Sequence, residues 1–222
     1  MAMRCRLVVL ISGSGSNLQA IIDAVDDRRI PGEIIAVISN RPGVKGLERA
    51  KKAGIPAITL DHTGYADRAA FDRALQQQLE TLDPDLVILA GFMRILPESL
   101  VNRFHGKMLN IHPSLLPKYR GLHTHRRALE NGDAQHGVSV HFVTPELDGG
   151  PVIIQAHVDV APDHTEETLA ADVLKREHRI YPLVVQWYCQ GRLRLEGDTP
   201  LLDDQLLESP LRYSEELERR VG

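Results

Sequence analysis

Cysteine is scarce in this sequence, and its scarcity excludes several classes of protein. The 222 residues hold two cysteines, Cys5 and Cys189, which lie far apart and form no CxxC motif. A disulfide-stabilised scaffold and a thiolate zinc site both need more cysteines in closer spacing. The composition therefore favours a reducing compartment.

Long apolar runs are also lacking. No stretch approaches the roughly 20 apolar residues that cross a bilayer. Residues 1–10 run directly into a strand-like segment and show no cleavage signature. We therefore predict a cytoplasmic protein with no membrane partner.

An excess of positive charge is the third absence. The chain has 26 Lys and Arg against 30 Asp and Glu, a net charge of −4. Residues 198–222 hold seven acids and three arginines, so they carry this whole net charge. Because affinity for nucleic acid comes mainly from neutralised phosphates, a neutral body predicts no nucleic-acid partner. Any phosphate that binds should be small and locally held.

Strand-like apolar runs alternate with segments of helical period. The expected strands are 6–11, 34–39, 86–90, 107–111, 138–143 and 152–160, and the expected helices are 17–28, 44–53, 67–82, 123–131 and 165–190. This alternation predicts the α/β class, with a mostly parallel twisted sheet and helices on both faces in three layers. The last helix must accommodate Pro182, and residues 201–222 are expected as a helical appendage or a disordered tail. No boundary stands out, so we predict one domain.

A glycine-rich turn, Ser12-Gly-Ser-Gly-Ser-Asn17, joins the first strand to the first helix. Such a turn lets backbone N–H groups and the helix dipole hold an anion. A dinucleotide fingerprint is disfavoured, because Leu18 stands where a small residue is needed and Ser39-Asn40 replaces the acid after the second strand. The alternative is a turn that only packs helix on strand.

Asn110 and His112 lie two residues apart at the end of a predicted strand. Alternation places both side chains on one face, at the sheet edge where ligands bind in open α/β folds. An amide donor beside an imidazolium can hold an oxyanion and deliver a proton, as acyl transfer requires. The alternative is that both residues satisfy loop backbone groups.

The loop Leu147-Asp-Gly-Gly-Pro151 projects a carboxylate between two strands. Asp148 near His112 would favour the protonated imidazolium. The alternative is an ordinary hairpin turn. Ser139 and His141 on the preceding strand either line the same cleft or are polar positions of a half-exposed strand.

Several catalytic motifs are missing. Ten histidines are present, yet none lies in HExxH or in a supporting ligand set, so the sequence predicts no metal site. The sequence also has no GxSxG elbow and no CxxC, which leaves a covalent serine or cysteine mechanism without support. Direct transfer is the simpler prediction.

Six blocks of this sequence resemble the phosphoribosylglycinamide formyltransferases, a branch of the 10-formyltetrahydrofolate-dependent formyltransferase family. They are VLISGSGSNLQA at 9–20, LAGFMRIL at 89–96, LNIHPSLLPK at 109–118, GLHTH at 121–125, HGVSVHFV at 136–143 and LDGGPV at 147–152. NIHPSLLP and LDGGP mark the wider family, whereas SGSGSNLQA, GFMRIL and EHRIYP at 177–182 indicate the purine branch. The resemblance extends in order to about Leu195.

The resemblance implies a Rossmann-like formyltransferase fold and a particular set of site residues. The implied catalytic residues are Asn110, His112 and Asp148. The implied ribonucleotide-binding residues are Gly15, Ser16, Asn17, Leu18, Gln19, Leu174, Lys175, Arg176 and Glu177. The implied folate-binding residues are Arg68, Met93, Arg94, Ile95, Leu96, Asn110, Thr144, Pro145, Glu146, Leu147 and Asp148. The domain would be residues 1–197, with a nucleotide-binding half at about 1–105, a folate and catalytic half at about 106–197, and an acidic tail or appendage at 198–222.

The implied reaction is formyl transfer from 10-formyltetrahydrofolate to the amine of 5-phosphoribosylglycinamide in purine (IMP) biosynthesis, through a tetrahedral intermediate. It needs no metal and no tightly bound cofactor, and 10-formyltetrahydrofolate enters as cosubstrate. The expected partners are these small molecules, and the chain is expected as a monomer or homodimer. Arg120 departs from the proline or small residue of many relatives, and it either touches the folate tail or is a solvated surface arginine.

Other members of the fold class provide the alternatives. A 10-formyltetrahydrofolate hydrolase would carry an extra N-terminal domain, and a methionyl-tRNA formyltransferase would need a further RNA-binding domain. A non-catalytic nucleotide-binding module is the third alternative. That module predicts loss of the catalytic trio, whereas Asn110, His112 and Asp148 are all present.

Overall fold

The computed structural model describes residues 4–221, which form two compact units that divide between Leu109 and Asn110. In the first unit the strands are hydrogen-bonded in the order β4-β1-β2-β3. The strands are β1 (Cys5–Ile11), β2 (Gly32–Ser39), β3 (Ala57–Thr59) and β4 (Leu86–Leu89). The helices are α1 (Ser16–Asp26), α2 (Lys45–Lys52), α3 (Arg68–Leu82) and α4 (Glu98–Arg103), with a 3₁₀ turn at His62–Gly64. The strands β1, β2, β3 and β4 pair in parallel.

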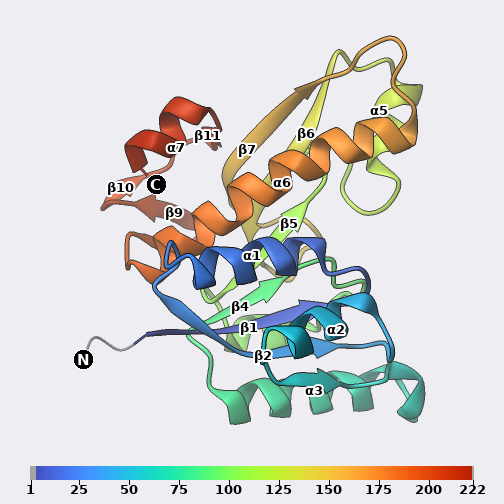
Figure 1. The fold of residues 1–222 in the computed structure, drawn as a ribbon, viewed down its shortest axis with the longest axis vertical. Coiled ribbons are helices and arrows are strands. Elements are labelled where there is room, and N and C mark those ends of the chain that lie inside the picture. Colours follow the sequence, from blue (N-terminus) through green and yellow to red (C-terminus); the bar gives the residue numbers. More distant parts are fainter. Residues whose placement is uncertain (1–3, 222) are drawn as a thin grey trace. The chain divides into compact units, whose positions relative to one another are not determined.

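The core of the first unit follows from its apolar runs. Residues 7–11 of β1 and all of β4 are buried, as expected for parallel strands that are covered on both faces. Figure 1 shows α1 and α3 on opposite sides of these strands. Asp67 caps α3 by accepting a hydrogen bond from the Ala70 N–H at 2.7 Å, so the helix begins where its apolar stripe begins.

In the second unit the strands are hydrogen-bonded in the order β11-β7-β6-β5. The strands are β5 (Met108–His112), which begins just before the division, β6 (Gln135–Phe142), β7 (Val152–Asp159) and β11 (Leu211–Arg212). A separate small sheet has the order β10-β9-β8, from β8 (Leu193–Glu196), β9 (Thr199–Leu202) and β10 (Gln205–Leu206). The helices are α5 (Thr124–Glu130), α6 (Glu166–Cys189) and α7 (Glu215–Val221).

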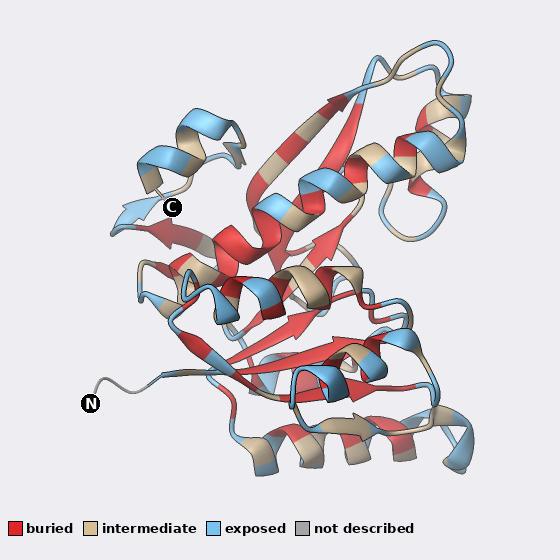
Figure 2. Cartoon of the chain, in the orientation of Figure 1, coloured by how far each residue is buried: buried red, intermediate tan, exposed pale blue. Residues whose placement is uncertain are grey.

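Helix α6 packs on β6 and β7 and forms much of the core of the second unit. Tyr181 and Trp187 on this helix are fully buried. In Figure 2 part of α6 is coloured as buried, whereas α7 is coloured as exposed or intermediate. A capping box between Thr165 and Thr168 starts the helix. Pro182 lies inside it, as the sequence requires.

The end of the chain is attached to β7. β11 pairs with β7 in parallel, and the Tyr213 N–H donates to the Gln155 carbonyl at 2.8 Å. The Trp187 indole N–H donates to the Val221 carbonyl at 2.7 Å. Residues 198–221, expected as a tail or appendage, therefore hold β9, β10, β11 and α7.

The structure confirms the α/β class with mostly parallel strands, and each of the expected strands and helices appears within a few residues of its predicted bounds. The elements that the sequence analysis missed are β3, α4, β8 and the elements after it. They are short, and their apolar periods are too brief to stand out. The predicted domain boundaries near 105 and 197 stay predictions. Within residues 4–221, no helix combines the length and the apolar character of a membrane span.

The packing of α3 predicts a stability effect. Leu79 on α3 is fully buried, whereas Gln77 on the same helix is exposed. We expect Leu79→Ala to lower the free energy of unfolding by about 2–5 kcal/mol, because the truncation removes buried methyl groups and leaves a cavity. Gln77→Ala should change it by less than about 0.5 kcal/mol. Urea unfolding measures both, and equal effects would contradict this account of the core.

Candidate active site

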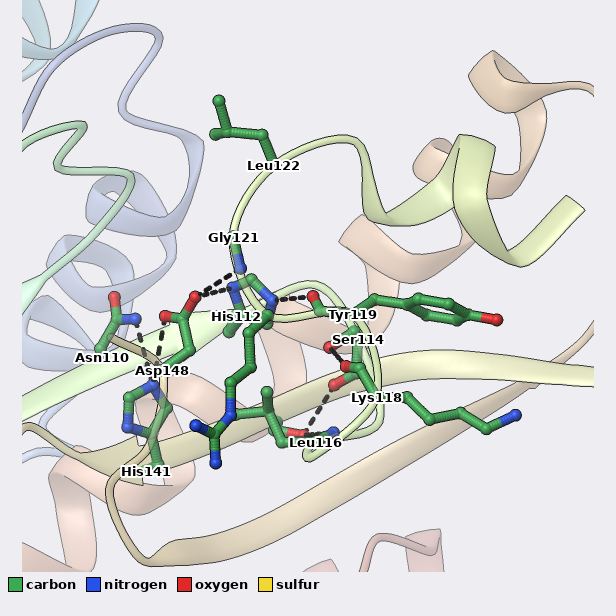
Figure 3. Close-up of polar contacts among 12 residues, drawn as sticks. Asn110, His112, Ser114, Leu116, Lys118, Tyr119, Gly121, Leu122, His141 and Asp148 are labelled. Atoms are coloured by element: carbon green, nitrogen blue, oxygen red, sulfur yellow. Dashed lines mark hydrogen bonds and ion pairs between the residues drawn. The ribbon is translucent and has the colours of Figure 1, made fainter. Parts of the chain in front are cut away.

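Strand β5 ends in the two polar side chains that the sequence singles out. Asn110 and His112 alternate with buried Ile111, and His112 is itself only 6% exposed. Figure 3 shows both beside Asp148, which comes from the loop between β6 and β7. The structure therefore brings the predicted trio together within the second unit.

Both ring nitrogens of His112 face oxygen atoms. Nε2 donates to the backbone carbonyl of Tyr119 at 2.8 Å, and Nδ1 lies 3.4 Å from the Asp148 carboxylate. Since a carbonyl can only accept, Nε2 carries a proton in this arrangement. When Nδ1 gives up its proton, the ring stays in the Nε2–H tautomer. Nδ1 is therefore the nitrogen that can exchange a proton with a reacting group.

Asp148 lies in a tight turn that requires glycine at position 150. Its backbone is left-handed, with φ +48°, and its Oδ2 accepts the Gly121 N–H at 2.8 Å. A Cβ on Gly150 would lie 1.8 Å from the Phe142 carbonyl oxygen. The two interpretations of Asp-Gly-Gly, a hairpin turn and a loop that projects a carboxylate, are therefore compatible. The same turn joins β6 to β7 and directs the Asp148 carboxylate towards His112.

His141 on β6 holds the Asn110 amide. The ring is buried and its Nδ1 donates to the Phe142 carbonyl at 2.8 Å, so Nε2 accepts from the Asn110 amide nitrogen at 3.2 Å. Burial lowers the pKa of His141 to about 4, which keeps the ring neutral near pH 7. The bond uses one of the two amide hydrogens of Asn110 and leaves the other for a ligand.

Ser139, two residues before His141, fixes the start of the loop that follows β5. Its hydroxyl donates to the Ser114 carbonyl at 2.7 Å and accepts the Leu116 N–H at 3.1 Å. Gln155 on β7 donates from Nε2 to Ser139 Oγ and to the Leu116 carbonyl. The polar alternation along β6 therefore serves the site. Ser139 holds the loop after β5, and His141 holds the Asn110 amide.

The glycine-rich turn of the first unit has the form of an anion site. Gly15 is left-handed, with φ +68°, and stands as the N-cap of α1, where no side chain of the described residues caps the helix. A Cβ on Gly15 would lie 2.6 Å from the Gly46 Cα, so glycine is needed for the turn to approach α2. Arg49 on α2 donates to the Ser14 carbonyl at 2.9 Å. The free helix end and this guanidinium favour a bound phosphate.

Comparison with known proteins agrees with this geometry. The family model described as formyl transferase matches residues 5–185. The phosphoribosylglycinamide formyltransferase of Escherichia coli is 55% identical over 201 residues, which cover 90% of this chain and 95% of that protein.

The chain belongs to the formyl transferase family.

Two further relatives place this formyl transferase among proteins of purine metabolism. The phosphoribosylglycinamide formyltransferase of Coxiella burnetii, solved in complex with CHES, superposes with a TM-score of 0.91 at 47% identity and covers 96% of this chain and 100% of that one. The human trifunctional purine biosynthetic protein adenosine-3 is 45% identical over 192 residues, 86% of this chain but 19% of that longer protein.

The folate-binding residues predicted in the first unit of this formyl transferase lie together. Arg68 donates to the Ile95 carbonyl at 2.7 Å, and the Arg94 guanidinium lies 4.7 Å from the centre of the Phe71 ring. Met93 and Ile95 are exposed by 58% and 50%, whereas Leu96 is buried. Exposed apolar side chains beside two guanidinium groups suit a flat ring system with an acidic tail.

The remaining predicted residues belong to the second unit. Of the loop Thr144, Pro145, Glu146, Leu147 and Asp148, Glu146 pairs with Arg120 and Leu147 is exposed. Arg120 is exposed and pairs with Glu146, a predicted folate-binding residue, so both alternatives for Arg120 stay open. On α6, Glu177 is buried, Lys175 pairs with Asp172 at 2.7 Å, Arg176 is exposed and Leu174 is half-buried.

Two contributors, Arg49 and the Tyr119 carbonyl, were not singled out by the sequence analysis, and His141 was named there only as one of two alternatives. The roles of all three depend on tertiary contacts. The alternation of Ser139 and His141 along β6 was the sequence signal that pointed to His141. A backbone carbonyl such as that of Tyr119 leaves no signal in the sequence. Among residues 4–221, no group of His, Cys, Asp or Glu is arranged to hold a metal ion.

Two buried histidines of this formyl transferase predict an acid-sensitive fold. Burial lowers the pKa of His136 and of His141 to about 4, against 6.5 for an exposed histidine. Because only the unfolded chain binds these protons, the free energy of unfolding should fall from pH 6.5 towards pH 4. The slope is up to about 1.4 kcal/mol per pH unit for each histidine. Below pH 4 both states are protonated and this loss ends.

Urea unfolding across this pH range measures the slope. We expect His136→Gln to make the slope shallower, because a proton that the folded state excludes is removed. An unchanged slope in that variant would show that His136 does not contribute.

Proposed function

We propose that this formyl transferase moves the formyl group of 10-formyltetrahydrofolate to the amine of 5-phosphoribosylglycinamide. The products are formylglycinamide ribonucleotide and tetrahydrofolate, in the purine pathway. The observation that carries the proposal is the meeting of the Asn110, His112 and Asp148 side chains at the end of β5. The names and the high identity of the relatives support the choice of substrates.

The reaction needs charge stabilisation and one proton relay. The amine nitrogen forms a bond to the formyl carbon and loses a proton, while the bond from that carbon to N10 breaks and N10 gains a proton. Negative charge develops on the formyl oxygen between these events. Preorganised N–H donors at that oxygen and a group of suitable proton affinity nearby therefore supply most of the catalysis.

The side chains of the second unit suit both needs. The amide hydrogen of Asn110 that His141 does not use and the Nδ1–H of His112 are the two donors for the oxygen. The Asp148 carboxylate lies 3.4 Å from Nδ1 and would balance positive charge on the His112 ring in the intermediate. Because His141 is neutral, it does not compete with His112 for the Asp148 charge.

Substrate binding is assigned by residue, within each unit. The turn Gly15 to Gln19, with the uncapped start of α1, would hold the ribonucleotide phosphate. The segment Leu174 to Glu177 on α6 would hold the ribose. Arg68, the segment Met93 to Leu96 and the loop Thr144 to Asp148 would hold the folate. The enzyme would act as a monomer or homodimer in the cytoplasm.

An assay of the purified chain tests the proposal. We expect deformylation of 10-formyltetrahydrofolate that requires 5-phosphoribosylglycinamide and continues in EDTA. Deformylation without the ribonucleotide would identify a hydrolase, with water as the acceptor. No turnover under any of these conditions would favour a non-catalytic nucleotide-binding module.

Substitution of His112 tests its role in the transfer. We expect His112→Ala to lower kcat by about 10²–10⁴, because both the oxyanion donor and the proton carrier are lost. Ribonucleotide affinity, measured by calorimetry, should stay within about twofold, since the ring contacts the reacting group only. His105→Ala, at an exposed histidine after α4, is the matched control and should retain full activity. Full activity in His112→Ala would remove this residue from the mechanism.

A further inference from the structure

One tripeptide of the loop after β5 contacts both members of the His112–Asp148 pair. The Tyr119 carbonyl accepts the Nε2 proton of His112 at 2.8 Å, and the Gly121 N–H donates to Asp148 Oδ2 at 2.8 Å. Figure 3 shows both backbone groups beside the pair, the Tyr119 carbonyl next to His112 and Gly121 next to Asp148. The orientation of His112 and of Asp148 therefore depends on the position of the segment Tyr119 to Gly121.

The backbone of this tripeptide needs support from outside itself. Tyr119 is left-handed, with φ +57°. This conformation is unfavourable for a residue with a Cβ, and it persists only where surrounding contacts hold it. The conformation matters because it sets the direction of the Tyr119 carbonyl.

The Tyr119 phenol provides that support. Its hydroxyl donates to Asp133 Oδ2 at 2.6 Å and accepts from the Asn131 amide at 2.7 Å. The hydrogen bond from Tyr119 and the nearby Lys118 ammonium lower the pKa of Asp133, so the acceptor is a carboxylate and the bond is charge-assisted. The phenol is thereby tied to the turn between α5 and β6, on the far side of the loop from His112.

Arg127 on α5 holds the same segment from a second direction. Its guanidinium lies 4.9 Å from the centre of the Tyr119 ring, and its Nη1 donates to the Arg120 carbonyl at 2.7 Å. The Arg127 guanidinium thus covers one face of the Tyr119 ring, while the Tyr119 hydroxyl is held by its hydrogen bonds. These contacts restrict the backbone of residue 119 without any side-chain contact to the reacting groups.

We propose that Tyr119 is a positioning residue for formyl transfer, whose phenol, bonded to Asp133, fixes the carbonyl that keeps His112 in the Nε2–H tautomer. The inference rests on the proposed function. Without the anchor, the carbonyl leaves Nε2 and the single proton of neutral His112 can settle on Nδ1, against Asp148. Nδ1 is then no longer able to take up the proton that the reaction releases.

A tyrosine that only stabilised the loop would have a different effect from one that sets the tautomer. A stabilising role predicts a lower melting temperature or weaker substrate binding, with His112 unchanged in the molecules that remain folded. A positioning role predicts a lower kcat together with a changed protonation pattern of the His112 ring. The two are separated by a measurement on the ring itself.

Removal of one hydroxyl tests the proposal. Tyr119→Phe keeps the ring and its contact with Arg127 but loses the bond to Asp133. We expect kcat to fall about tenfold, with the KM for the ribonucleotide within about twofold of its original value. The matched control is Tyr213→Phe, which removes another phenol–carboxylate bond of this unit, that of Tyr213 to Glu218. It should leave kcat unchanged.

Nitrogen-15 NMR of labelled histidine gives the second readout. Above the titration of the ring, we expect the original protein to show His112 as the Nε2–H tautomer and Tyr119→Phe to show a mixture with Nδ1–H. His112→Ala identifies the resonance by its absence. In the His112→Ala background, Tyr119→Phe should cause no further loss of kcat, because both changes act through the same ring.

Two results would overturn the proposal. One is an unchanged His112 tautomer in folded Tyr119→Phe, whatever its kcat. The other is a further loss of kcat when Tyr119→Phe is added to His112→Ala. If the original protein fails to formylate the ribonucleotide, the proposed function fails, but the NMR comparison still decides whether Tyr119 controls the His112 ring.

Discussion

The His112 ring, held between a backbone carbonyl and a carboxylate, is the constraint on which the second unit depends. Nε2 bonds to the Tyr119 carbonyl and Nδ1 faces Asp148 at 3.4 Å. For both to be in place, β5 must end at residue 112, the following loop must return to it, and the connection from β6 must turn sharply at Gly150. Features that look independent along the chain therefore serve one ring.

Two simple rules made a meeting of Asn110, His112 and Asp148 one of the open alternatives, and the family resemblance was needed to imply a catalytic trio. Alternation puts Asn110 and His112 on one face of a strand, and the Asp-Gly-Gly turn projects Asp148 from another connection. The rules give proximity but no tautomer. The Tyr119 backbone carbonyl determines which nitrogen of His112 carries the proton. The position of that carbonyl depends on tertiary contacts, and no sequence pattern indicates it. The neutral state of His141 likewise follows from burial, which a single sequence does not record.

The prediction of the fold reached a similar level of detail. It missed elements whose position depends on tertiary contacts. Long apolar runs such as β1 and β4 predicted buried parallel strands, and these are present. β3 has three residues and β11 has two, so their positions are set by the strands they pair with and not by a pattern of their own. Arg120 shows the same limit for side chains, since its pairing with Glu146 depends on two loops 26 residues apart.

The end of the chain is connected by hydrogen bonds to the loop that follows β5. The Tyr213 N–H donates to the Gln155 carbonyl, and the Gln155 side chain donates to Ser139 and to the Leu116 carbonyl at the start of that loop. This connection uses the backbone N–H of Tyr213 and not its phenol, so it depends on the path of the chain at residue 213 and passes through one residue of β7. Loss of order in this part of the chain would remove the hydrogen bond to the Gln155 carbonyl, and with it one support of the residue that holds Ser139 and Leu116.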